Sequence, residues 1–342
     1  MLRNRPTMRV PAVRSARERP AACFLLLLVA LPGLAACSGT QSALDPHGPV
    51  ADSIATTWWV LFWGAGAILA LVMGLVLYAM FRDPERKARL PHLPFLVGAG
   101  LVFPTLVLTA LVVFGTLVGR DITRASDDAL VIEVTGHQWW WEVRYPATAD
   151  APEVVTANEL HLPVGVPVEF VIESADVVHS FWIPNLGGKV DMIPGRSNTL
   201  RLEASRPGRF RAQCAEFCGA QHSRMGFIAI ATEADEFERW RRARAVAPDA
   251  SGPGLARFDA LGCSGCHALG GRPAEGGTGP VLAHFAERPT VGAGAAANTP
   301  GALRAWLADH GARMKPGSLG PAQRRLDDAD VEAIARLLEQ QR

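Results

Sequence analysis

The chain has 342 residues, a formal net charge of +1, and 49% hydrophobic residues. A charge this close to zero argues against nucleic acid or another polyanion as the partner. The length predicts two or three domains. Long apolar runs lie before Gly119 and polar segments follow it, which predicts a membrane anchor ahead of soluble domains.

The N-terminus reads as an export signal. Arginines precede a short apolar run, residues 23–31, which is too short to span a bilayer. We therefore predict a signal peptide over residues 1–36. The run Leu34-Ala-Ala-Cys37 resembles the cleavage box of bacterial lipoproteins, in which Cys37 would become the lipidated first residue. Ordinary signal cleavage nearby and a retained N-terminus are the alternatives.

Two uncharged apolar segments, residues 56–80 and 93–118, are each long enough to span a membrane as a helix. The basic loop between them, residues 81–92, is expected in the cytoplasm by the positive-inside rule. The segment before the first helix, residues 37–55, and everything after the second helix then lie outside the cytoplasm. Pro104 predicts a kink in the second helix.

The soluble part divides into an all-β and a helical region. Short runs rich in β-branched and aromatic residues, broken by Gly, Pro and Asn, predict a sandwich or barrel over residues 129–232. A basic helix and a linker follow over residues 233–254. The last domain, residues 255–342, contains helical stretches at 300–310 and 327–341.

A cluster of soft ligands lies near the end of the β-region. Cys214, Cys218, His222 and Met225 fall within twelve residues. Thiolate and thioether suit copper, and so does imidazole. His179, at a hydrophobic strand end, is the candidate second imidazole. The alternatives are a disulfide for the cysteines and a core histidine for His179.

The order His, then Cys-x-x-x-Cys-x-x-x-His-x-x-Met, resembles the CuA domain of cytochrome c oxidase subunit II. The resemblance covers residues 41–232 and includes the runs Gly-His-Gln-Trp-Trp-Trp, His-Ser-Phe-Trp-Ile-Pro and Gly-Lys-Val-Asp-Met-Ile-Pro-Gly-Arg. It implies a dinuclear copper centre in which the two cysteines bridge two metals. His179 and Met225 would complete one copper, and His222 with the backbone carbonyl of Glu216 the other.

The same resemblance implies two further roles. The Glu216 side chain would help to bind a magnesium ion at the interface with subunit I, where the alternative is a solvated acidic residue. Trp139 would be the tryptophan through which electrons enter. Three consecutive tryptophans also fit a buried aromatic cluster, and both interpretations can hold.

The motif Cys263-Ser-Gly-Cys266-His267 is the attachment signature of c-type haem. The two thiols form thioethers and His267 becomes an axial iron ligand. With its context, residues 255–342 resemble a class I cytochrome c. A subunit II with such a C-terminal domain is similar to those of caa-type oxidases.

The sixth iron ligand departs from the pattern of that family. Gly320 occupies the place where the family has a ligating methionine. Met314 is the one methionine of the domain, and we favour it as the ligand. His310, His284 and a five-coordinate iron are the alternatives, and His284 also matches a non-ligand position of the family.

The resemblance implies a multidomain fold: a two-helix transmembrane hairpin, an all-β cupredoxin-like sandwich and an all-α class I cytochrome c domain. The chain would serve as subunit II of a proton-translocating cytochrome c oxidase in a bacterial inner membrane, with both soluble domains periplasmic. Its partners would be subunit I, other oxidase subunits, membrane lipid, and cytochrome c or a bc-type complex as donor. Electrons would pass from the covalent haem to the copper pair and on to the oxygen-reducing centre of subunit I.

Rival functions are less consistent with the residues. A membrane-anchored copper and haem carrier without an oxidase partner is the alternative, and the two-helix hairpin with Glu216 argues against it. Quinol oxidase subunits lack the copper ligands that are present here, and a nitrous oxide reductase would need a large propeller domain. Residues 93–118 contain no acidic residue, which argues against a contribution of this chain to proton uptake.

Overall fold

The computed structural model describes residues 38–81, 92–124, 128–149, 151–309, 314–317 and 326–342. The chain divides into two compact units, residues 1–39 and 40–342, and the second is described here. The predicted signal peptide, Cys37, most of the loop between the apolar segments, His310 and Gly320 lie outside the described residues.

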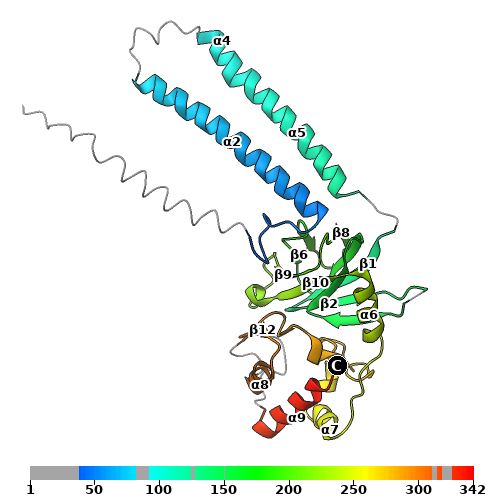
Figure 1. Ribbon diagram of the computed structural model, residues 1–342. Coiled ribbons are helices and arrows are strands. Elements are labelled where there is room, and N and C mark those ends of the chain that lie inside the picture. The colour runs from blue at the N-terminus through cyan, green and yellow to red at the C-terminus, as the bar shows by residue number, and fades with distance from the viewer. Residues whose placement is uncertain (1–37, 82–91, 125–127, 150, 310–313, 318–325) are drawn as a thin grey trace, which may run out of the picture. The chain divides into compact units, whose positions relative to one another are not determined.

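Two long apolar helical segments begin the unit (Figure 1). The first is α2 (Pro49–Phe81), and the second comprises α4 (His92–Val97), the π-helical η2 (Gly98–Val102) and α5 (Phe103–Ile122). Both are long and apolar enough to cross a membrane, and their apolar side chains are largely exposed. Pro104 lies in the first turn of α5, where a missing backbone N–H is tolerated, directly after the π-helical turn.

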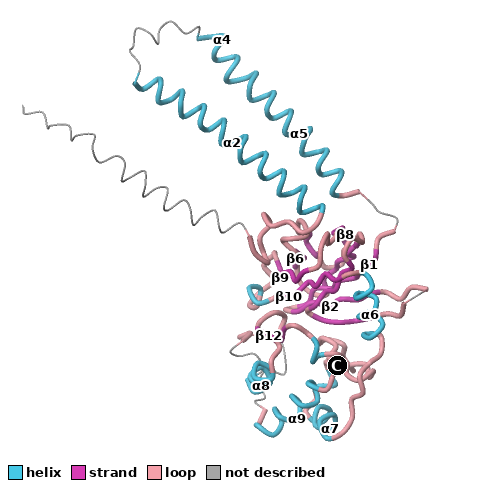
Figure 2. The backbone as a smooth tube through the Cα atoms, in the orientation of Figure 1, coloured by secondary structure: helices cyan, strands magenta, loops and turns pink. Residues whose placement is uncertain are grey.

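The β-region is built from two five-stranded sheets (Figure 2). The first has the order β3-β2-β1-β5-β8. Its strands are β1 (Leu130–His137), β2 (Trp140–Tyr145), β3 (Val154–Ala157), β5 (Val168–Ser174) and β8 (Asn198–Leu202). Alternate residues of β1 are buried, so that Ile132 and Val134 face the core, as a period of two residues requires.

The second sheet has the order β4-β10-β9-β6-β7. Its strands are β4 (Glu159–Pro163), β6 (His179–Trp182), β7 (Val190–Met192), β9 (Gly208–Cys214) and β10 (Gly226–Thr232). In the antiparallel pairing of β6 with β9, Phe181 lies opposite Cys214. This register brings the start of β6 close to the end of β9.

Aromatic side chains from both sheets form the core. Trp141 and Phe170 come from the first sheet, Phe181 and Phe227 from the second, and all are fully buried. The rings of Trp141 and Phe227 lie 5.4 Å apart edge to face, and those of Phe181 and Phe227 lie 5.3 Å apart. Each such side chain stabilises the sandwich by about 1.5–3 kcal/mol through burial. The core lies directly beneath the strand ends that carry the candidate copper ligands.

The C-terminal domain is helical. Before it, α6 (Ala234–Arg244) packs against the sandwich core through Phe237. The elements of the domain are α7 (Pro253–Ala260), η4 (Cys263–Gly265), η5 (Phe285–Glu287), β11 (Thr290–Val291), β12 (Ala296–Ala297), α8 (Pro300–Asp309) and α9 (Asp328–Glu339). Asp327 caps α9 by accepting a hydrogen bond from the Asp330 backbone N–H. Phe258, Leu303 and Ile334 belong to its core. Two apolar helices, a β-sandwich and a helical C-terminal domain confirm the predicted fold class.

Candidate metal centres

The candidate copper ligands come from two neighbouring strand ends and one loop. His179 is the first residue of β6 and Cys214 the last residue of β9. Cys218, His222 and Met225 lie in the loop that joins β9 to β10, with His222 opening the short helix η3 (His222–Arg224). The backbone N–H of Cys214 donates to the Met225 carbonyl at 2.9 Å, which closes the base of the loop.

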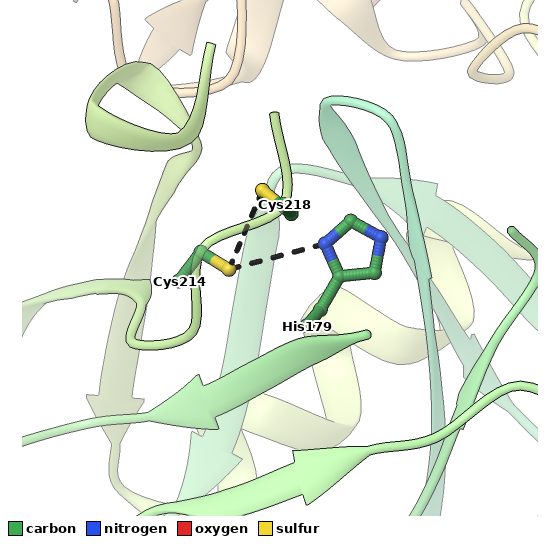
Figure 3. Close-up of side chains that lie close together, drawn as sticks. All are labelled: His179, Cys214 and Cys218. Carbon is green, nitrogen blue, oxygen red and sulfur yellow. Dashed lines mark hydrogen bonds between the residues drawn. The ribbon is translucent and has the colours of Figure 1, made fainter. Parts of the chain in front are cut away.

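The structure brings all five predicted side chains together. Figure 3 shows the two sulfurs and the His179 ring facing one another. The pairs are separated as follows: Cys214 Sγ–Cys218 Sγ 3.8 Å, Cys214 Sγ–His179 Nδ1 3.9 Å, Cys218 Sγ–His222 Nδ1 3.7 Å, Cys218 Sγ–Met225 Sδ 3.7 Å and Cys214 Sγ–Glu216 O 3.2 Å. Both sulfurs are free thiols at non-bonded distance, so the disulfide alternative does not hold in this structure.

The chemistry of this donor set fits copper. Cys214 and Cys218 are buried and lie beside each other. The pKa of Cys214 is lowered, chiefly by its hydrogen bond with Cys218 and also by the neighbouring His179. The pKa of Cys218 is raised by the same hydrogen bond and by burial. A buried pair of cysteines flanked by imidazole and thioether is a soft ligand set.

Asp176 orients the His179 ring, a role that the sequence reasoning missed. Its Oδ1 lies 2.9 Å from His179 Nε2, and its Oδ2 accepts from the Gln138 backbone N–H at 2.6 Å. Nδ1 is therefore the nitrogen that faces the sulfurs. Burial opposes ionisation of Asp176, but the hydrogen bonds from His179 and from backbone N–H groups outweigh it and hold its pKa below the usual range. The one signal in the sequence was the position of Asp176, an acidic residue three positions before His179.

Trp139 lies against the ligand loop. Its indole Nε1 donates to the Cys218 carbonyl at 2.9 Å, and the Gln138 side-chain amide donates to the same oxygen at 2.8 Å. The peptide bond between Gln138 and Trp139 is cis. Trp141, by contrast, packs in the centre of the core. The tryptophan run therefore supplies both a residue at the ligand loop and a packing residue.

Glu216 lies between the two cysteines in the ligand loop. Its carbonyl is the one close to Cys214, and its partly buried side chain accepts only a 3.3 Å hydrogen bond from the Phe217 backbone N–H among the described contacts. The neighbouring Phe217 is 73% exposed. A carboxylate and a large apolar side chain thus lie at an open surface next to the ligands, a composition typical of a protein interface.

The haem motif folds as a short helix with its histidine oriented. Cys263 and Cys266 are free thiols, and Cys263 opens η4. His267 Nδ1 lies 2.8 Å from the Pro280 carbonyl, a contact that orients the imidazole ring. Gly279 allows this approach, because a Cβ at that position would lie 2.8 Å from His267 Cε1. The thiols and the oriented imidazole fit a covalently attached haem.

The two described candidates for the second axial ligand differ in their surroundings. Met314 is partly buried in the turn that precedes Lys315. His284 is buried, and neither of its ring nitrogens has a hydrogen-bond partner among the described residues. Burial, followed by the nearby Arg244 charge, lowers the pKa of His284.

Comparison with known proteins identifies the family. The sequence profile described as "Cytochrome C oxidase subunit II, periplasmic domain" matches residues 147–232, and the profile "Cytochrome c" matches residues 253–342. The protein named cytochrome c oxidase subunit 2 of Alkalihalophilus pseudofirmus is 32% identical over 340 residues, which cover 94% of this chain and 97% of the relative. The chain belongs to the cytochrome c oxidase subunit 2 family.

Further relatives share the name. Cytochrome c oxidase subunit 2 of Bacillus subtilis is 29% identical over 92% of this chain and 96% of its own length. A similar solved structure is the crystal structure of the periplasmic domain of subunit II of cytochrome oxidase (CoxB) of Bradyrhizobium japonicum. Its sequence is 31% identical, the TM-score is 0.33, and the match covers 35% of this chain and 96% of the CoxB chain.

Membership of the family settles the general function. The chain is the electron-transferring subunit 2 of a haem-copper cytochrome c oxidase, and the C-terminal cytochrome c domain fits a caa-type fusion. It functions with other subunits of the oxidase, because subunit 2 is one component of that complex. The oxidase reading of the sequence is thereby confirmed.

Proposed function

We propose that subunit 2 binds a pair of copper ions through Cys214, Cys218 and their neighbours. Both sulfurs would bridge the two metals, with His179 and Met225 completing one copper and His222 and the Glu216 carbonyl the other. The main support is that five donor atoms, from two cysteines, two histidines and one methionine, each lie within 3.9 Å of a cysteine sulfur. When bound, the copper pair supplies one-electron chemistry with little change in geometry, because a rigid scaffold fixes its ligands.

For the haem, we propose thioether bonds from Cys263 and Cys266 and axial ligation by His267. The Pro280 carbonyl accepts from His267 Nδ1, which orients the ring and increases its basicity as a ligand. Met314 would be the sixth ligand. A thioether there favours a higher reduction potential of the iron, as a respiratory carrier requires.

Two residues would connect the copper site to its surroundings. Trp139 is the proposed point of electron entrance, supported by its indole hydrogen bond to the Cys218 carbonyl. The Glu216 side chain would help to hold a magnesium ion at the interface with subunit I. Support comes from its position beside the exposed Phe217.

The placement in the cell is also proposed from these features. Helix α2 and the segment of α4, η2 and α5 would cross the bacterial inner membrane against lipid and subunit I. Both soluble domains would lie in the periplasm, where cytochrome c or a bc-type complex would donate electrons. Cys37 would carry lipid if the lipoprotein box is used.

Optical and EPR spectra of the purified full-length chain, without subunit I, test the proposal. We expect a mixed-valence copper signal together with the spectrum of a low-spin c-type haem. A copper signal typical of a single isolated ion, or the absence of both signals after copper loading, would disprove the assignment. Haem that remains while copper is absent would disprove only the copper half.

A further inference from the structure

The turn formed by residues 314–317 of the haem domain, here called the Lys315 turn, contacts the copper ligand loop. Lys315 Nζ donates to the Trp139 carbonyl at 2.6 Å. From the other side, the Gln221 side-chain amide donates to the Pro316 carbonyl. Both partners lie next to Cys218. The Trp139 indole donates to the Cys218 carbonyl, and Gln221 follows Cys218 in the same loop.

A second turn of the haem domain contacts the opposite end of the loop. The backbone N–H of Gly226 donates to the Ala293 carbonyl at 2.9 Å. A Cβ at Gly294 would lie 3.2 Å from the Gly226 carbonyl carbon, so the two backbones are in close contact. Gly226 follows Met225 directly. The copper loop is therefore contacted next to Cys218 and next to Met225.

Lys315 is an unusual residue for such a contact, because its side chain is buried. The residue is 4% exposed, and the Cys218 sulfur and the Arg224 guanidinium lie near it. Burying an ammonium costs several kcal/mol unless it is hydrogen-bonded and compensated. Packing alone does not require the amino group, because a methionine side chain would fill the same space as the lysine stem. The hydrogen-bond donor of Lys315 is thus directed at the Trp139 carbonyl.

We propose that Lys315 is a positioning residue that joins the haem domain to the copper centre for electron transfer. Its contact continues into a hydrogen-bonded route: Lys315 Nζ to the Trp139 carbonyl, then the Trp139 indole Nε1 to the Cys218 carbonyl. Electron tunnelling is faster along bonds and hydrogen bonds than across gaps. The inference rests on the proposed roles of Trp139 and of the two metal sites.

The first test needs no metal. Hydrogen–deuterium exchange of the full-length chain, purified without copper, compares wild type with Lys315→Met, which keeps the side-chain length but removes the donor. Loss of a charged hydrogen bond should raise exchange in residues 136–145 and 218–226 about tenfold. Arg336→Met is the matched control, because that arginine is exposed on α9 and distant in role. Exchange that is unchanged in Lys315→Met overturns the proposed contact.

The second test measures transfer in the intact oxidase. A photoreductant reduces the haem in a flash, and oxidation of the haem and reduction of copper are followed by absorbance. We expect Lys315→Met to slow this step about tenfold or more, which equals roughly 1.4 kcal/mol in the barrier. The haem spectrum, the haem potential and the copper spectrum should stay as in wild type, whereas loss of structure would alter them.

The outcomes distinguish failure of the haem-to-copper relay from failure of the proposed role of Lys315. If wild type shows no transfer from haem to copper, the proposed relay fails. If wild type transfers and Lys315→Met transfers within about twofold of it, only the role of Lys315 is refuted. Should Lys315→Met lose a metal centre, Gln221→Met removes the neighbouring contact with Pro316 and must slow transfer for the proposal to stand.

Discussion

The copper site and the haem site of this subunit are organised differently. The copper ligands lie on β6, on β9 and in the loop to β10, and their donor atoms converge from these separate parts of the chain. At the haem site, Cys263, Cys266 and His267 lie in one short stretch, whereas Met314 lies in a turn far along the chain. The sandwich thus assembles one site from two strand ends and a loop, whereas the helical domain takes three of its haem-binding side chains from a single local motif.

Cys218→Ser should produce the largest change and separates the two sites. Copper binding should be lost, because a hydroxyl is a poor bridging ligand for a soft metal, while haem content stays unchanged. Metal analysis and EPR of the purified full-length chain provide the measurement. Cys263→Ser is the crossed control, since it should weaken haem attachment and leave the copper signal intact. Simultaneous loss of both cofactors in either variant would contradict independent sites.

Met314→Ala tests the weaker half of the haem site. The iron should change from low spin to high spin, because a strong axial ligand is replaced by water or by nothing. Optical and EPR spectra detect the change. His284→Gln is the control and should leave the spin state unaltered, since His284 matches a non-ligand position of the family. A low-spin iron in Met314→Ala would refute the assignment of Met314.

Asp176→Ala probes how far the copper site is preformed. Without the carboxylate, His179 loses the partner that orients its ring, and copper affinity should fall by about 10–100-fold. Competition titration with a copper chelator measures it on the chain lacking copper. Asp235→Asn, at an exposed position of α6, should retain wild-type affinity. An unchanged affinity in Asp176→Ala would mean that the strands alone orient His179.

Gly279→Ala should have the smallest effect of these substitutions on its metal site. Gly279 lies beside the His267 ring. The new methyl group would lie 2.8 Å from His267 Cε1, so the ring must tilt or shift. We expect retained haem with a shifted reduction potential, measured by spectroelectrochemistry. Gly301→Ala, where a Cβ meets nothing within 4 Å, is the control. A potential equal to that of wild type would show that the ring is free to adjust.

The sequence predicted the parts that rest on short-range patterns. The spacing of Cys214, Cys218, His222 and Met225 is a local property, and so are the short β-branched and aromatic runs that indicated the sandwich. Helix ends were predicted less well: α2 begins at Pro49, before the apolar run, because polar residues can continue a helix beyond the membrane. The Lys315–Trp139 contact joins residues 176 positions apart, and no local pattern encodes it.

The most direct test of the central claim is cofactor content of one purified full-length chain, loaded with copper. Elemental analysis should give two copper ions for each haem iron, and the haem should stay with the polypeptide in a denaturing gel, because thioether bonds survive unfolding. A single copper ion per iron, or haem that separates from the denatured chain, would contradict a bridged copper pair or covalent attachment by Cys263 and Cys266, respectively.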